Sequence, residues 1–227
     1  MIYFVFDIET VKDCRLLELA GSDRDKERAE NGEFVNPVFH IPICFSFMAF
    51  NQKKLFAFES HAGREEKIVR TFWNKVGKVI NRNPIFVSFN GKNFDLPVMV
   101  VRGIKLADEE VKKVIRYYME DSDKWEKERP NYTRKYTRYH IDLMEAFGIK
   151  TSLKALCTLF EIPVKTEAHG SEVEELYKDG ELKKIATYCA EDVLATARLL
   201  EVFLDTKDDQ NFSFLKEILE AKLVVEE

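Results

Sequence analysis

Short apolar segments that favour β-strands alternate along the chain with amphipathic segments that favour helices. The first apolar run ends abruptly at Asp7, as a buried strand does. Two further apolar runs are separated by the polar turn 51–54 and predict a hairpin. The complete set of predicted strands covers residues 2–6, 43–50, 55–58, 85–89 and 136–141.

Four segments are predicted to form helices. Residues 64–80 place seven apolar side chains on one helical face, and a second helix is predicted to begin near Asp95. Ser152 is suited to cap a short helix that stops before Pro163. The strongest helix follows Gly180. Its predicted buried stripe is Leu182, Ile185, Ala186, Cys189, Val193, Ala197, Leu200 and Leu204.

The remaining segments are less regular. Residues 13–36 are polar and predict a loop or short helix, and residues 105–135 lack a clean period. After a polar break at 205–210, apolar residues from Phe212 to Leu223 predict an amphipathic tail helix. The chain is therefore expected to form one α/β domain over residues 1–204, followed by a C-terminal linker and amphipathic helix over residues 205–227.

Composition agrees with a globular domain. The chain has 227 residues, of which 45% are hydrophobic and 12% aromatic, so a disordered chain is excluded. The longest apolar stretch is interrupted by Pro42 and Ser46 and is too short to cross a bilayer. The N-terminus reaches Asp7 without a secretory signal, and the four cysteines are widely spaced. We expect a cytoplasmic protein with reduced thiols.

The net charge is −5, which argues against a broad surface that coats duplex nucleic acid. The negative charge is compatible with an enzyme that binds only a few nucleotides and whose acidic residues are concentrated in a metal site.

Carboxylates stand at positions where apolar residues are expected. Asp7 and Glu9 end the first strand two residues apart, so they project from the same face. Asp95 follows the strand 85–89, and Tyr188 and Asp192 are one helical turn apart. Taken singly, these are better explained by strand-end polarity, a helix cap and surface decoration respectively.

Taken together, the same acids predict one site. Sites in α/β sheets form at the carboxyl ends of strands, where both strand-borne groups lie. A cluster with this much negative charge requires a partner, and oxygen ligands suit Mg²⁺ or Mn²⁺.

These segments resemble a known family. Residues 6–10 (FDIET), 90–95 (NGKNFD) and 188–192 (YCAED) resemble, in order and spacing, the three motifs of the DEDD 3′–5′ exonucleases. The first motif is most similar to the proofreading domains of B-family DNA polymerases. Residues 152–165 and 170–199 also resemble the stand-alone, polymerase-B-like predicted exonucleases. The resemblance spans almost the whole chain and implies a ribonuclease H-like mixed sheet, with an antiparallel hairpin plus parallel strands flanked by helices.

The resemblance also implies a mechanism. The tyrosine subclass is indicated, because no histidine lies just ahead of Asp192. Asp7, Glu9, Asp95 and Asp192 would hold two divalent ions, Mg²⁺ or Mn²⁺, and Tyr188 would orient the attacking water with help from Glu9. The products would be nucleoside 5′-monophosphates.

Substrate contacts are predicted beside the motifs and in one basic segment. Ile8, Thr10, Asn90 and Phe94 adjoin the motif acids and would contact the terminal nucleotide. Residues 129–140 contain four basic residues, no acids and three tyrosines, a composition suited to single strands. Its candidates are Arg134 and Arg138. The alternative is a solvated loop and edge strand.

One polar pair in this region has two interpretations. His140 and Asp142 could form an extra polar site near the acids, or a strand end followed by a helix-capping aspartate.

The predicted function is hydrolysis of single-stranded 3′ ends, DNA more than RNA, by a monomer in a role resembling proofreading or DNA repair. One alternative is a catalytically silent binding module, which would be expected to lose a motif carboxylate. Another is a phosphohydrolase that acts on small nucleotides with the same metal site.

Overall fold

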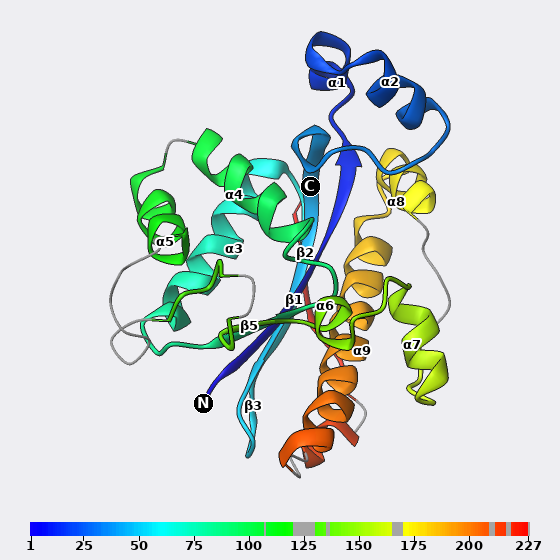
Figure 1. Ribbon diagram of the computed structural model, residues 1–227. Coiled ribbons are helices and arrows are strands. Elements are labelled where there is room, and N and C mark those ends of the chain that lie inside the picture. The colour runs from blue at the N-terminus through cyan, green and yellow to red at the C-terminus, as the bar shows by residue number, and fades with distance from the viewer. Residues whose placement is uncertain are drawn as a thin grey trace.

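The computed structural model is built around one six-stranded mixed sheet, with strand order β5-β4-β1-β2-β3-β6 (Figure 1). β1 is antiparallel to β2 and β2 to β3, whereas β4 is parallel to β1, β5 to β4 and β6 to β3. The strands are β1 Tyr3–Lys12, β2 His40–Phe50, β3 Leu55–Ala62, β4 Ile85–Ser88, β5 His140–Asp142 and β6 Lys222–Val225. The structure describes residues 1–106, 108–119, 130–134, 137–164, 170–208, 212–216 and 219–226.

Helices cover both faces of this sheet (Figure 1). α3, α4 and α5 lie on one face, α9 with α7 and α8 lies on the other, and α1 and α2 project beyond the end of β1. The bounds are α1 Cys14–Ala20, α2 Asp23–Glu30, α3 Glu65–Ile80, α4 Asp95–Lys105, α5 Glu109–Met119, α6 Leu143–Phe147, α7 Leu153–Leu159, α8 Gly170–Lys178 and α9 Leu182–Asp208, with 3₁₀ turns η1 Pro37–Phe39 and η2 Ser213–Lys216.

The alternation of side chains along β1 divides the core in two. Phe4, Phe6 and Ile8 pack with α3 and α4, while Tyr3 and Val5 pack with α9. Since alternate side chains of a strand share a face, this register turns the next odd-numbered side chains, which are acidic, towards α9.

A bulge breaks the pairing of β1 with β2 beside those acids. Glu9 pairs with Cys44 and Thr10 with Pro42, so the register shifts between them. Proline has no N–H to donate to a ladder, and bulges are typical where a strand must be bent next to a site. The extra residue, Ile43, belongs to β2, so β2 is the strand that bends opposite Glu9 and Thr10.

Most predicted elements are confirmed. The predicted strands match β1 to β5, although β5 covers only the end of the predicted segment, and Tyr136 lies outside the described residues. The predicted end of the first strand is wrong: β1 pairs with β2 as far as Lys12, so Asp7 and Glu9 lie within the strand. α3, α4, α7 and α9 also match, and Ser152 caps α7 by accepting a hydrogen bond from the Ala155 N–H at 3.1 Å. This agreement confirms the mixed-sheet, ribonuclease H-like fold class.

Two predictions for irregular segments are wrong. Residues 109–119 form α5, whose Val111, Ile115 and Tyr118 are buried at helical spacing that the flanking charges obscured. The tail is not a helix where it is described: it contains η2 and then β6, which pairs with the open edge of β3. The edge strand β3 offers unpaired backbone N–H and C=O groups, with which the tail pairs as a strand. The helical pattern of the tail sequence does not predict this pairing.

None of the helices in the described ranges combines the length and apolar character needed to cross a membrane.

Candidate active site

β1 delivers two acids to the face of the sheet that α9 covers. Ligand atoms of Asp7, Glu9 and Cys189 all lie within 4.8 Å of one another. The Cys189 thiol lies 3.5 Å from the Asp7 carbonyl oxygen and 3.7 Å from its Oδ2, with the geometry of a donor to both. Cys189, predicted only as a packing residue of α9, thus also fixes the distance between helix and strand at the site.

Asp95 joins the cluster from the beginning of α4. The Ile8 N–H donates a hydrogen bond to Asp95 Oδ1 at 3.1 Å, so the first and second motifs are directly connected. Asp95 is buried, and Gly91 lies close beneath it: a Cβ at Gly91 would lie 3.4 Å from Asp95 Oδ2 and 2.5 Å from the Ser88 Cβ. The glycine in this motif is therefore required by the close approach of the loop to β4.

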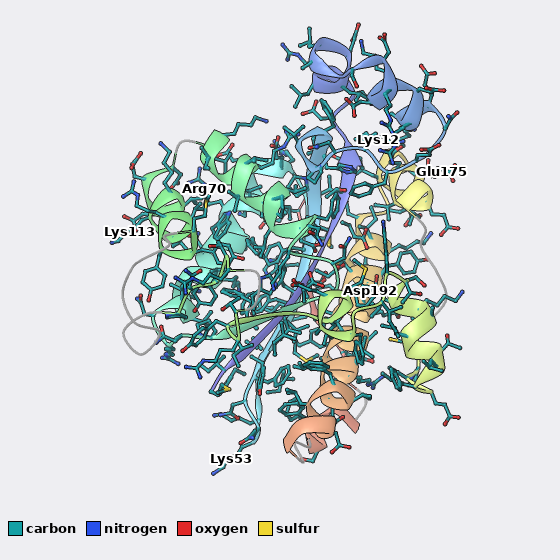
Figure 2. All side chains as sticks on the ribbon, viewed as in Figure 1. Lys12, Lys53, Arg70, Lys113, Glu175 and Asp192 are labelled. Atoms are coloured by element: carbon teal, nitrogen blue, oxygen red, sulfur yellow. The ribbon has the colours of Figure 1, made fainter. Side chains whose placement is uncertain are left out.

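Tyr188 and Asp192 stand one turn apart on α9, and Figure 2 shows Asp192 where the helix passes the central part of the sheet. The buried Cys189 and Val193 fix this face of α9 against the sheet. Packing of the apolar stripe thus holds the tyrosine and aspartate beside the strand ends, as the helical period predicted.

Burial and mutual repulsion raise the pKa of every acid in the cluster. The pKa of Asp7 is raised by burial and then by Asp95, Glu9 and Asp192. The pKa of Glu9 is raised to about 8, by burial and then by Asp192 and Asp95. Burial raises the pKa of Asp95 to about 7 and that of Asp192 to about 6, with further contributions from Asp142 and Glu191 respectively. The four carboxylates therefore form a single electrostatic unit.

This unit fits divalent cations. Within the part of the chain that the structure describes, no lysine or arginine forms an ion pair with any of the four acids. Buried carboxylates without a basic partner are costly, and hard cations with oxygen ligands offset that cost. The donor set is thus the one that Mg²⁺ or Mn²⁺ prefers.

Asp142 fixes the second motif from the neighbouring strand. Its side chain is buried, and it accepts hydrogen bonds from the Asn90 N–H at 2.9 Å and from the Lys92 N–H at 3.0 Å. The Ser88 hydroxyl donates to it at 3.4 Å and also bonds His140 at 3.0 Å. Asp142 occupies the N-cap position of α6 without capping that helix, so the capping interpretation is wrong: the side chain serves the motif loop instead.

The predicted substrate residues beside the motifs differ in placement. Thr10, Asn90 and Phe94 are all partly exposed next to the acids, and Asn90 has the left-handed φ of 64°. Ile8 is 5% exposed, with its side chain in the core and its N–H donated to Asp95. Its side chain therefore packs in the core beneath the site and is not accessible to a substrate.

The structure does not bring the basic segment to the carboxylates. Arg134 and Arg138 are exposed, but both precede β5, whereas Asp7 and Glu9 lie in β1 past the carboxyl end of the parallel strand β4, and Asp95 follows β4. Tyr132 is buried and stacks on Tyr118, and Arg138 packs over the Tyr139 ring. Tyr132 and Tyr139 thus serve packing. Arg129, Lys135 and Tyr136 lie outside the described residues.

Comparison with protein families decides the relationship of the chain. Residues 32–213 match the model of a family described as predicted 3′–5′ exonucleases related to the exonuclease domain of PolB. The chain belongs to this family. The second and third motifs lie within the matched residues.

Other comparisons add little to this assignment. No curated protein matches the chain. Among solved structures, apo Exonuclease I is similar with 10% sequence identity and a TM-score of 0.40. That match covers 94% of this chain and 44% of the other, so the chain spans less than half the length of Exonuclease I.

Proposed function

We propose that this exonuclease removes nucleotides from the 3′ end of single-stranded nucleic acid, DNA in preference to RNA, and releases nucleoside 5′-monophosphates. The observation that carries the proposal is the convergence of four carboxylates, Asp95 buried and the other three partly buried, with raised pKa values and no basic partner in the described chain, where β1 runs past the carboxyl end of β4. Tyr188 stands one helical turn from the last of them.

Two divalent cations, Mg²⁺ or Mn²⁺, would be held by Asp7, Glu9, Asp95 and Asp192. Such ions, when bound, lower the pKa of water and stabilise the negative charge of the leaving oxygen. Tyr188 would orient the attacking water by a hydrogen bond from its hydroxyl, assisted by Glu9. The chain itself would thus contribute the metal ligands and the orientation of the water.

The surroundings of the cluster support a single-stranded substrate. Thr10, Asn90 and Phe94 border the acids from the α4 side and are available to the terminal nucleotide. The net charge of −5 opposes extended contact with duplex phosphates, so binding is expected to be short and centred on a strand end. DNA is preferred because the motifs most resemble those of polymerase proofreading domains. We also propose that the protein acts as a monomer in the cytoplasm, where its four free cysteines would stay reduced.

Digestion of labelled single strands tests the proposal. Strands of DNA and RNA carrying a 3′ or a 5′ label are incubated with Mg²⁺, with Mn²⁺ or with chelator. We expect mononucleotides to be released first from the 3′ label, on DNA faster than on RNA, and no product in chelator. Release from the 5′ end, or full activity in chelator, would refute it.

Variants of α9 assign the activity to the site. Asp192→Asn should abolish cleavage with the fold intact, and Tyr188→Phe should slow turnover without loss of metal binding. Asp205→Asn is the matched control, because Asp205 is exposed on the same helix and remote from the cluster. Full activity in Asp192→Asn would refute the assignment of cleavage to this carboxylate cluster.

Two alternative functions, a nucleotide phosphohydrolase and a catalytically silent binding module, are distinguished by substrate length and by binding without cleavage. A phosphohydrolase would hydrolyse a dinucleotide at least as fast as a long strand. A silent module would bind the strand without releasing any product.

A further inference from the structure

A groove separates α9 from the C-terminal tail, on the face of the sheet that α9 covers. Its volume is about 380 Å³, within the range of sites that bind small molecules. α9 lines it from Thr187 to Arg198, which is about 16 Å of helix, and residues 219–223 line it where the tail enters β6. The groove is therefore elongated, and its shape suits a linear ligand.

The lining of this groove is mostly apolar. Phe58 of β3 and Ala190 of α9 are buried, whereas Leu194, Leu219 and Leu223 are only partly buried. These leucines keep apolar surface in contact with water, although each belongs to a segment that packs on the core. Covering that surface with a hydrocarbon chain is favourable, because apolar area is removed from water on both sides of the contact.

One basic side chain lies in the groove. The Arg198 Nε–H donates a hydrogen bond to the Leu215 carbonyl oxygen at 3.3 Å. Among the residues that the structure describes, no acidic side chain forms an ion pair with Arg198. Since the guanidinium group carries further N–H donors in a planar fork, it can still bind a carboxylate through parallel hydrogen bonds.

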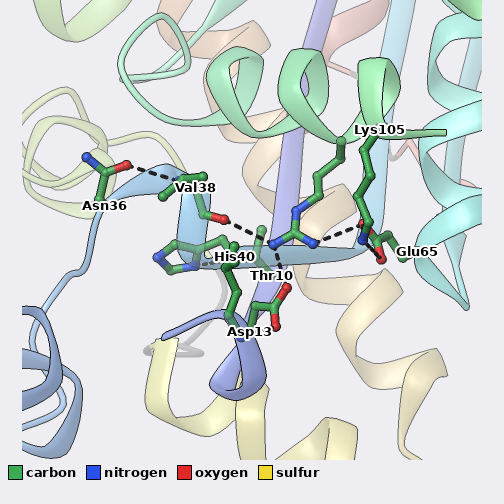
Figure 3. A network of polar contacts seen from close by, with 9 residues as sticks. Thr10, Asp13, Asn36, Val38, His40, Glu65 and Lys105 are labelled. Carbon is green, nitrogen blue, oxygen red and sulfur yellow. Dashed lines mark hydrogen bonds and ion pairs between the residues drawn. The ribbon is translucent and has the colours of Figure 1, made fainter. Parts of the chain in front are cut away.

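The arginine of α4 shows how this chain satisfies such a group internally (Figure 3). Arg102 donates to Asp13 Oδ2 at 2.9 Å, to the Val38 carbonyl oxygen at 3.1 Å and to Glu65 Oε1 at 3.1 Å. Its side chain is 4% exposed, and its charge is compensated by the carboxylates of Asp13 and Glu65. Arg198 lacks this compensation within the described ranges, so an acidic ligand would supply it.

We propose that the groove binds a linear aliphatic monocarboxylate, with its hydrocarbon chain along the leucines and its carboxylate on Arg198. Glu191 and Glu220 also line the groove, and their charges would repel a ligand that carries a second negative charge. A carboxylate monoanion therefore fits better than a phosphate dianion, and a nucleotide is disfavoured.

The groove and the carboxylate cluster lie on different faces of α9. Thr187 and Glu191 directly precede Tyr188 and Asp192, and consecutive residues of a helix point about 100° apart. The ligand would thus leave the place of the nucleic-acid strand open. The inference goes beyond the proposed function and does not depend on it.

Calorimetric titration with aliphatic compounds tests the groove. The probes are octanoate, its neutral counterpart 1-octanol and octyl phosphate, each below its micelle concentration and with Mg²⁺ present. The variants are Arg198→Gln, which removes the charge, and Leu194→Trp, which fills the groove with a larger side chain. Arg24→Gln and Leu19→Trp are the matched controls, because both residues are exposed on the α1–α2 segment that projects beyond β1.

We expect octanoate to bind the wild type at a single site, and 1-octanol and octyl phosphate to bind about tenfold more weakly. Arg198→Gln should weaken octanoate binding about tenfold, as expected for a lost hydrogen bond between charged groups, and leave 1-octanol unchanged. Leu194→Trp should weaken the binding of both compounds. From hexanoate to octanoate, each added CH₂ should tighten binding about fourfold. Both control variants should bind octanoate as the wild type does.

The proposal is overturned when the wild type shows no saturable binding of octanoate, or when Arg198→Gln binds it equally well. Tighter binding of octyl phosphate would overturn the choice of a monocarboxylate. An acid coordinated to a cation at the carboxylate cluster would bind both groove variants like the wild type, so that result also counts against the groove. Thermal unfolding of each variant checks that the fold is intact, and release of mononucleotides in Mg²⁺ tests the proposed function separately.

Discussion

Replacing Glu9 by glutamine should stabilise the metal-free protein at neutral pH, although the residue is expected to be needed for activity. Burial, followed by Asp192 and Asp95, raises the pKa of Glu9 from 4.5 to about 8. Between these values the unfolded chain carries an ionised Glu9 while the folded chain still binds its proton. Stability from this group is therefore present below pH 4.5 and is lost as the pH rises towards 8.

The size of the effect follows from the two pKa values. Relative to an unperturbed group, Glu9 lowers the free energy of unfolding by about 1 kcal/mol at pH 5 and about 3 kcal/mol at pH 7. The gain from Glu9→Gln should thus grow by roughly 2–3 kcal/mol between these pH values, or about 5–10 °C in Tm for a chain of this length.

The buried His140 has the opposite effect on how the free energy of unfolding depends on pH. Burial and then Lys92 lower the pKa of His140 to about 3, so the folded protein gains stability as the pH rises through 6.5. Its contribution between pH 5 and 7 is about 2 kcal/mol, opposite in sign to that of Glu9. The difference between the wild type and Glu9→Gln retains the Glu9 contribution, because His140 is common to both.

Urea unfolding in chelator at pH 5 and pH 7 measures this difference, with the exposed Glu18→Gln as the matched control. We expect Glu9→Gln to exceed the wild type clearly at pH 7 and only slightly at pH 5. Addition of Mn²⁺ should stabilise the wild type more than the variant and so remove or reverse the difference. An equal effect of Glu9→Gln at both pH values, or an advantage that Mn²⁺ leaves unchanged, would refute the electrostatic account of the site.

Four further substitutions test how the site is held. Asp142→Asn removes one carboxylate oxygen from the Asn90–Lys92 backbone and should cost about 1–3 kcal/mol in urea unfolding and lower kcat; a wild-type kcat would contradict its positioning role. Gly91→Ala should lower kcat with modest loss of stability, because its Cβ would meet Ser88; unchanged activity would show that the loop can shift freely. Arg102→Leu leaves the partly buried Asp13 without its ion pair and Glu65 with Lys105 alone, and should cost about 2–3 kcal/mol, measured as Tm. Arg138→Ala should leave kcat/KM unchanged. A tenfold fall in kcat/KM would show that the basic segment contacts the substrate.

The acids of the site are encoded locally, and so the sequence alone determined them. Asp7 and Glu9 share a face because a strand alternates, and Tyr188 and Asp192 share a face because a helix repeats every 3.6 residues. The apolar stripe on α9 likewise predicts which side of that helix is buried. These are short-range geometric rules, and the motif order then identified the family.

Other features depend on contacts between residues distant in sequence, and only the tertiary structure decided them. Asp142 is 52 residues from Asn90, and nothing in its own segment indicates that it holds the motif loop rather than capping α6. The tail has a helical pattern yet forms β6, because β3 presents an open edge to it. The rings of Phe34 and Phe94 meet through the anchoring of two segments by Arg102. In each case the deciding partner comes from elsewhere in the fold, so its contribution has no signature in the local sequence.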